Sequence, residues 1–385
     1  MKLPKRSQNL LQPSRLLSVV LLGGLAYEMV EMMSQAITAQ DSTTKTANSQ
    51  AGLTTSMPSQ ISREDFFVTS DPGIQIFVRE VRATSSPTNT RVPILLLHGG
   101  GGAGLASFDV NVPGYSVAED LARDGHPIYI MDIRGFERST RIAQLDAPPE
   151  ANPPLVTSEE ALRDIDAVVD WIRTRNQGQP VALVGWATGG HWAGMYTSRN
   201  NDKVSHLVML NSLYGVNAPW DYRQNFENPE RPGEFDRTAA AYREATADGL
   251  IANWTRAIPT DDKSQWRDPA VAQAYQQITL DNDPTSGTRQ PPSVRLPGAF
   301  RLEAYNLSRG QKYWEASDIR VPTLYIRGEL DHWSRPEDLR TLEAELVNAP
   351  NAKAVTIPEG THFLLFDRPE RGRDRFITEV LSFID

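Results

Sequence analysis

A glycine-rich loop is the first segment of this chain whose residue types could do chemistry. The loop, HGGGGAG, begins at His98 and directly follows the apolar run Val92–Leu97. Glycines at the carboxyl end of a strand let backbone N–H groups approach a ligand without interference from Cβ atoms. A phosphate-binding loop is the competing interpretation, but the Lys-Ser/Thr ending is absent and no clean G-x-G-x-x-G helix start follows. We therefore interpret the loop as a set of backbone hydrogen-bond donors.

A second segment, GWATGG, spans Gly185 to Gly190 and follows the apolar run Val181–Val184. Small residues two positions before and after a central residue permit a strained strand-to-helix turn that projects the central side chain. The segment has the G-x-S-x-G frame of a nucleophile elbow, with Ala187 where serine is expected. A methyl group can neither attack a carbonyl nor exchange a proton. Thr188 is not expected to replace the nucleophile, because its side chain would point away from the turn.

The third feature is a separated pair, Asp331 and His362, each placed in a loop after a predicted strand. Alone, an aspartate in such a loop caps a turn and a histidine packs or lies on the surface. A histidine that acts as a base must be held in one tautomer, and a buried carboxylate on its other ring nitrogen does this. Behind an elbow frame, these two positions predict an acid–base pair.

The elements that must position these residues alternate between strand and helix. Continuous apolar runs predict buried strands, and apolar residues at helical spacing predict helices, one of them with Ser158 as its N-cap. Asp71-Pro72-Gly73 predicts the turn of an antiparallel hairpin. Repeated strand–helix units predict an α/β fold with a mainly parallel sheet flanked by helices. The predicted strands are 66–69, 74–81, 92–97, 127–131, 181–184, 204–210, 323–327 and 354–357, and the helices 117–123, 159–173, 191–198, 336–347 and 370–384.

Residues 213–311 interrupt this alternation of strands and helices and are rich in proline and aromatic side chains. A long insertion between core strands is often a functional lid. We therefore predict a helical cap domain at 213–311 and a core made of 64–212 and 312–385. Most of the aromatic side chains are expected to pack the cap itself, and a minority to line a pocket.

The N-terminal residues have the pattern of a secretory signal peptide. Basic residues precede the apolar run Leu16–Tyr27, and small residues at Ala36 and Ala39 offer two cleavage positions. Twelve apolar residues are too few for a relaxed membrane span. We predict a signal peptide at 1–39, a flexible lead-in at 40–63 and export to the periplasm or beyond, with an uncleaved anchor as the alternative.

Composition excludes several classes of function. The 385 residues carry 39 basic and 48 acidic side chains, a net charge of −9, and no cysteine. An acidic balance argues against nucleic acid as the main partner. The absence of cysteine excludes a disulfide scaffold, a thiolate metal site and a cysteine nucleophile.

Taken together, these motifs resemble the α/β-hydrolase family over roughly 66–384. The resemblance rests on LLLHGGGGAG, MDIRGFERS, VGWATGG, RGELD and GTHF, whose order of elbow, acid and histidine matches the family order. It implies an oxyanion hole formed by backbone N–H groups of Gly100 or Gly101 and of Thr188. Asp132 is assigned a structural role. Asn211 is not acidic, so the acid falls to Asp331.

The resemblance implies a serine hydrolase that cleaves an ester or lactone of a hydrophobic or aromatic small molecule, with residue 187, Asp331 and His362 as the triad. No metal or organic cofactor is implied. Because the elbow glycines, the glycine-rich loop, Asp331 and His362 are all present, we favour an engineered Ser→Ala change at residue 187, which makes this chain inactive. The alternatives are a natural pseudohydrolase that binds a ligand, an ancestral aspartate nucleophile, and hydrolysis of a C–C bond in a diketone. The sequence does not predict an oligomeric state.

Overall fold

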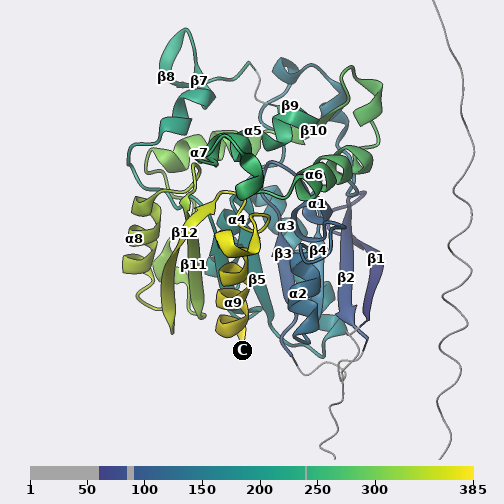
Figure 1. Ribbon diagram of the computed structural model, residues 1–385. Coiled ribbons are helices and arrows are strands. Elements are labelled where there is room, and N and C mark those ends of the chain that lie inside the picture. The colour runs from purple at the N-terminus through teal and green to yellow at the C-terminus, as the bar shows by residue number, and fades with distance from the viewer. Residues whose placement is uncertain (1–59, 85–90, 239–240) are drawn as a thin grey trace, which may run out of the picture. The chain divides into compact units, whose positions relative to one another are not determined.

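The computed structural model describes residues 60–84, 91–238 and 241–385. Its centre is an eight-stranded sheet in the order β1-β2-β4-β3-β5-β6-β11-β12 (Figure 1). The pairs β1–β2 and β2–β4 are antiparallel, and the remaining pairs are parallel. The α/β class with a mainly parallel sheet is therefore confirmed. The strands are β1 (Ile61–Thr69), β2 (Gln75–Ala83), β3 (Ile94–Leu97), β4 (Ile128–Met131), β5 (Val181–Trp186), β6 (Val204–Leu210), β11 (Thr323–Leu330) and β12 (Ala352–Thr361).

Helices cover both faces of this sheet, as the buried apolar runs of its central strands require. Helix α2 packs against α9, and α3 packs against α4. In Figure 1, α2 and α9 stand in front of the sheet and α3 lies behind it. The flanking helices are α1 (Gly104–Phe108), α2 (Val117–Arg123), α3 (Ser158–Arg175), α4 (Thr188–Arg199), α8 (Pro336–Glu345) and α9 (Arg373–Ile384).

Most element boundaries differ by a few residues from the sequence expectation, and two of the differences have a clear physical cause. Strand β1 begins at Ile61, inside the predicted lead-in, because residues 61–63 pair with β2. The N-cap of α3 is Thr157 and not Ser158: the Thr157 side chain accepts from the Glu160 backbone, and the Glu160 side chain accepts from the Thr157 backbone. This reciprocal capping box satisfies two helix N-terminal donors at once. The Ser158 hydroxyl is used elsewhere, on Glu303 at 2.6 Å.

The insertion between β6 and β11 lies over the carboxyl ends of the parallel strands (Figure 1). It contains the predicted helices and, in addition, two small antiparallel sheets that the sequence analysis did not predict. The β9–β10 pair joins residues about fifty positions apart, which a local reading of the sequence does not detect. The cap elements are β7 (Glu227–Asn228), β8 (Arg231–Phe235), β9 (Tyr242–Thr246), α5 (Ala247–Ala257), α6 (Pro269–Asn282), β10 (Ser293–Pro297) and α7 (Ala299–Ser308).

The predicted signal peptide, with its cleavage positions Ala36 and Ala39, and most of the lead-in lie outside the described residues. Within the described ranges, no helix is both long enough and apolar enough to cross a bilayer.

Candidate active site

The turn between β5 and α4 has the backbone of a nucleophile elbow. Ala187 adopts φ 54° and ψ −115°, a conformation that strains any residue with a Cβ atom. Its N–H donates to the Leu210 carbonyl at 2.8 Å, which ties the turn to the next strand. The turn also needs its glycines: a Cβ on Gly185 would lie 2.3 Å from the Gly189 carbonyl oxygen, and one on Gly189 would lie 2.2 Å from that of Leu97. The strand and helix therefore approach each other through backbone atoms.

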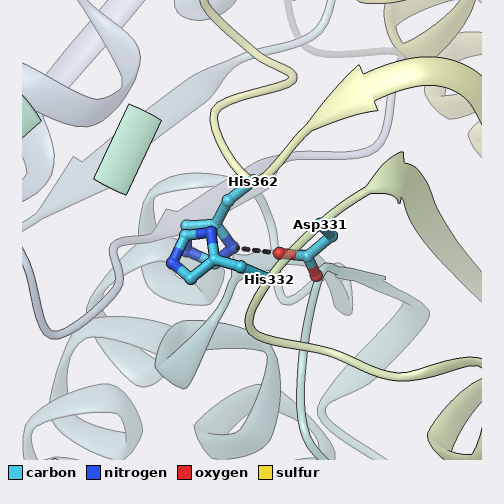
Figure 2. A group of neighbouring side chains, drawn as sticks. All are labelled: Asp331, His332 and His362. Atoms are coloured by element: carbon cyan, nitrogen blue, oxygen red, sulfur yellow. Dashed lines mark hydrogen bonds and ion pairs between the residues drawn. The ribbon is translucent and has the colours of Figure 1, made fainter. Parts of the chain in front are cut away.

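Asp331 and His362 contact each other, as Figure 2 shows, and His362 lines the same cavity as Ala187. The Nδ1 atom of His362 lies 2.7 Å from Oδ1 of Asp331. The backbone N–H groups of Trp333 and Ser334 also donate to this carboxylate, at 2.9 and 2.8 Å. Burial alone would raise the pKa of Asp331, but the charge of His362 and the hydrogen bonds outweigh it, so the pKa is lowered. Asp331 is therefore an ionised carboxylate that orients the imidazole through Nδ1.

The loop that carries His362 is held by two buried residues, Trp186 at the end of β5 and Asn211 directly after β6. The Trp186 indole donates to the His362 carbonyl at 2.9 Å. Asn211, fully buried, donates to the carbonyls of Thr361 and His362 at 3.2 and 3.0 Å. Its own oxygen accepts from the Gly328 N–H at 2.8 Å, on the strand that leads to Asp331. Asn211 therefore joins the two loops of the acid–base pair, a role that the sequence analysis missed when it considered this residue only as a non-acid.

His332 is a further residue that the sequence analysis missed, although it directly follows Asp331. Its ring centroid lies 4.8 Å from that of His362 (Figure 2). Its Nδ1 atom is buried without a hydrogen-bond partner in the described part of the chain. Burial first, and then the nearby charge of His362, lower the pKa of His332 to about 3, so this imidazole is neutral near pH 7.

Asp331, His332 and His362 each offer one potential metal-ligand atom, and these atoms lie within 4.8 Å of one another. A metal ion would need lone pairs of Asp331 that are already used. One carboxylate oxygen binds His362 and the Trp333 N–H, and the other binds the Ser334 N–H and hydroxyl. Because the pair is satisfied as it stands, an acid–base role fits this cluster better than a metal site.

The glycine-rich loop lies against the elbow. A Cβ on Gly99 would lie 3.3 Å from the Cβ of Ala187, which measures how closely the two segments approach. His98 is fully buried and fixes the loop, with Nδ1 donating to the Gly99 carbonyl at 2.7 Å and Nε2 accepting from the Ile133 N–H at 3.1 Å. Burial lowers the pKa of His98 to about 4, so His98 is a neutral structural residue.

Asp132 has the structural position that the sequence suggested. It is fully buried and accepts from the backbone N–H groups of Gly104 and Arg138, at 2.8 and 3.2 Å. It therefore anchors the end of the glycine-rich loop to the segment after β4.

A cavity of about 680 Å³ opens above the elbow. Ala187 and His362 line it, and so do Gly100, Gly101 and Thr188, the three residues predicted for an oxyanion hole. Of the cap aromatics noted in the sequence, five line this cavity, which agrees with the expected minority: Tyr222, Phe226, Tyr242, Tyr275 and Phe300. The described structure thus brings five of the six predicted site residues to one cavity beneath the cap, and the sixth, Asp331, contacts the cavity residue His362. Its volume suits a small organic molecule.

Comparison with known proteins agrees with the observed fold. A sequence profile of the family described as the alpha/beta hydrolase fold matches residues 92–369. A human (lyso)-N-acylphosphatidylethanolamine lipase is 30% identical over 148 residues, which are 38% of this chain and 36% of the lipase. This chain spans about a third of the length of the curated relatives it matches.

Solved structures share the fold at low sequence identity. A bromoperoxidase from Bacillus anthracis has a TM-score of 0.54 at 15% identity, covering 83% of this chain and 99% of that one. A thermophilic esterase from Thermogutta terrifontis has a TM-score of 0.53 at 19% identity, covering 84% and 100%. Since these two enzymes carry different names on one fold, function must be argued from the site.

Proposed function

The chain belongs to the α/β-hydrolase family, and from this we propose that its site is that of a serine-type hydrolase for a carboxylic ester or lactone. Ala187 stands at the nucleophile position of that site. With alanine at position 187, this chain would bind the substrate without forming an acyl-enzyme.

The observation that carries the proposal is the backbone of Ala187. A residue with φ 54° and ψ −115° is held in a conformation that costs about 1–3 kcal/mol, and such strain persists where the surroundings impose it. An alanine side chain gains nothing from being projected into the cavity. The strained turn is instead suited to an oxygen nucleophile at this position, facing the same cavity as His362.

In the serine form, the oxygen on residue 187 attacks the acyl carbonyl while His362 takes its proton. Asp331 keeps Nδ1 of His362 as the donor, so the other ring nitrogen is the base. Backbone N–H groups of Thr188 and of Gly100 or Gly101 would stabilise the oxyanion, and losing one such donor costs about 3 kcal/mol. His362 then returns the proton to the leaving alcohol, and a water activated by the same histidine releases the acid.

Without the nucleophile, the same site keeps its cavity and its acid–base pair. Loss of the nucleophile in a serine hydrolase lowers the rate by about 10⁶-fold, so this chain should bind an ester but turn it over at most feebly. The aromatic cavity wall supports a hydrophobic or aromatic substrate. The names of the relatives, a lipase and an esterase, support hydrolysis at an acyl carbonyl.

A second candidate function is ligand binding alone, and the alanine itself favours it. If Ala187 is native, the chain is a pseudohydrolase that uses the cavity to hold its ligand. The sequence of the gene in its source decides this point: a serine codon at position 187 would exclude the pseudohydrolase.

The Ala187→Ser variant tests the proposal. It should hydrolyse p-nitrophenyl esters of graded acyl length and be labelled by a serine-directed phosphonate. Ala252→Ser is the matched control, since Ala252 lines the same cavity from α5 and adds a hydroxyl away from the elbow. Absence of both turnover and labelling in a folded Ala187→Ser protein would overturn the serine-hydrolase proposal. Product analysis separates the C–C alternative, because an ester gives alcohol plus acid whereas a diketone gives ketone plus acid.

A further inference from the structure

The cap side of the cavity carries positive charge. Among the described residues that line it, three are arginines: Arg243 on β9, Arg256 on α5 and Arg301 on α7. Arg243 and Arg301 are half-buried, whereas Arg256 is exposed. Guanidinium groups that are partly shielded from solvent bind oxyanions strongly, because they donate several charge-assisted hydrogen bonds in a fixed geometry. The charge is thus placed where a ligand in the cavity can reach it.

The carboxylate on the cavity wall is engaged elsewhere. Glu244 accepts from the Ser293 hydroxyl at 2.9 Å and lies 3.5 Å from the guanidinium of Arg295. Both partners belong to β10, on the neighbouring strand of the cap. Glu244 is also exposed, so its charge is partly screened by water.

Two of the cavity arginines have neutral partners. Arg243 donates to the Gly249 carbonyl at 2.9 Å, and Arg256 donates to the side-chain oxygen of Asn253. In the ranges that the structure describes, neither forms an ion pair with a carboxylate. Their charges are therefore available to a ligand that carries an anionic group.

Arg301 lines the same cavity as Arg243. Burial, and then the positive charge of Arg243, lower the pKa of Arg301, with Asp236 opposing the effect. The Arg301 guanidinium carbon also lies 5.4 Å from the centre of the Phe226 ring, on the cavity wall. Two like charges on one wall repel each other, and a bound oxyanion would remove that repulsion.

This charged wall adjoins the reacting end of the cavity. Phe300, which precedes Arg301 on α7, packs so closely on the glycine-rich loop that a Cβ on Gly100 would lie 2.5 Å from its ring. A ligand whose acyl carbonyl lies at Ala187 and Gly100 would therefore extend past Phe300 toward Arg301 and Arg243.

We propose that the ligand of this cavity is an ester or lactone that also carries an anionic oxyacid group, a carboxylate or a phosphate, bound by Arg243 and Arg301. The proposal rests on the proposed function and narrows its substrate class. It adds a charged end to the hydrophobic or aromatic body that the sequence alone suggested.

Equilibrium binding to the unaltered chain tests whether the ligand carries an anionic group. Binding can be measured without turnover, because Ala187 is not a nucleophile. Three probes of similar size are compared by calorimetry at low and high salt: methyl 4-acetylbenzoate (neutral), monomethyl terephthalate (carboxylate) and methyl 4-(phosphonooxy)benzoate (phosphate). At least one anionic probe should bind about 10- to 100-fold more tightly than the neutral ester, with the advantage reduced by salt. The two anionic probes distinguish a carboxylate from a phosphate. Equal affinity for all three would overturn the proposal.

Substitutions then test whether Arg243 and Arg301 bind the anionic group of the ligand. Arg301→Met and Arg243→Met should each remove about tenfold of the affinity for the preferred anionic probe and change neutral-ester binding less than twofold. Arg231→Met is the control, since Arg231 is exposed on β8, pairs with Glu234 and does not line the cavity. Arg301→Lys should keep part of the anion preference. Equal weakening of neutral and anionic probes would contradict the assignment, and if a variant does not fold, the comparison of probes on the unaltered chain still decides the charge.

The two proposals fail in distinguishable ways. If Ala187→Ser hydrolyses neutral esters and shows no preference for anionic ones, only the anion site is wrong. If Ala187→Ser hydrolyses neither kind, the serine-hydrolase function is wrong, whatever the binding data show.

Discussion

The Nδ1 atom of His362 lies 2.7 Å from Oδ1 of Asp331, although 31 positions separate the two residues and each follows a different strand. Parallel strands β11 and β12 are neighbours in the sheet, so their carboxyl ends bring the two loops together. The same edge carries the elbow after β5. The geometry of the acid–base pair is thus a consequence of strand order.

Asp331→Asn should abolish most of the activity of the Ala187→Ser protein. The amide could donate to His362, favour the wrong tautomer and fail to stabilise the imidazolium, which lowers kcat by about 10³- to 10⁴-fold in such triads. Steady-state kinetics on a p-nitrophenyl ester measures this. Glu329→Gln is the control, because Glu329 is an exposed carboxylate on the same strand. A loss below tenfold for Asp331→Asn would show that another group orients the histidine.

Asn211→Ala should misplace both loops of the pair. It removes two donors to the His362 loop and one acceptor for the Gly328 N–H, all of them buried. We expect the free energy of unfolding to fall by about 1–3 kcal/mol, and kcat in the Ala187→Ser background to fall by about 10- to 100-fold.

Asn201→Ala provides the matched control for this change. Asn201 also bonds through both ends of its amide, to the Asp318 carbonyl and the Arg320 N–H, but on an exposed loop. An Asn211→Ala variant that loses stability while keeping full kcat would limit Asn211 to a structural role.

Gly189→Ala should destabilise the elbow, since the new Cβ would lie 2.2 Å from the backbone oxygen of Leu97 and 2.5 Å from that of His98. Backbone on both sides leaves no flexible side chain to move, and overpacking of this kind costs about 3 kcal/mol. The measurement is the Tm. Gly287→Ala, with nothing within 4 Å of its added Cβ, should leave the Tm almost unchanged. Equal Tm values for the two variants would mean that the elbow can relax.

Local signals were sufficient to predict much of the fold. Helix α2 and strand β6 have the predicted bounds, because an apolar stripe and an apolar run each define an element without help from distant residues. Positions 331 and 362 could be paired from the sequence because an elbow frame preceded them in the chain. Ala187 also lies at the predicted turn, with the predicted strain.

Long-range pairing explains what could not be predicted. The β9–β10 sheet joins Tyr242 to Pro297 across an intervening pair of helices, and no short motif announces it. Arg243 and Arg301 meet at the cavity for the same reason. In the sequence they are two of many cap arginines, and only the fold of the cap separates them from surface residues such as Arg231.

His191→Gln should make stability less sensitive to acid. His191 is buried at the start of α4, where its Nδ1 accepts from the Trp314 indole at 3.3 Å and its Nε2 has no partner within the described residues. Burial lowers the pKa of His191 to about 3, from the usual 6.5. Below pH 6.5 the His191 side chain therefore takes up a proton in the unfolded chain but stays neutral in the folded chain. Stability from this group is present above pH 6.5 and is lost as the pH falls.

Between pH 7.5 and pH 5, this linkage amounts to about 2 kcal/mol for one such histidine. Glutamine can still accept from Trp314 and does not titrate, so the variant should lose about 2 kcal/mol less than the parent over that interval. Denaturant unfolding at the two pH values measures the difference. Because the buried His98 acts with the same sign in both proteins, it cancels in the comparison. An identical loss in parent and variant would mean that His191 is protonated in the folded state at pH 5, which its burial beside the elbow argues against.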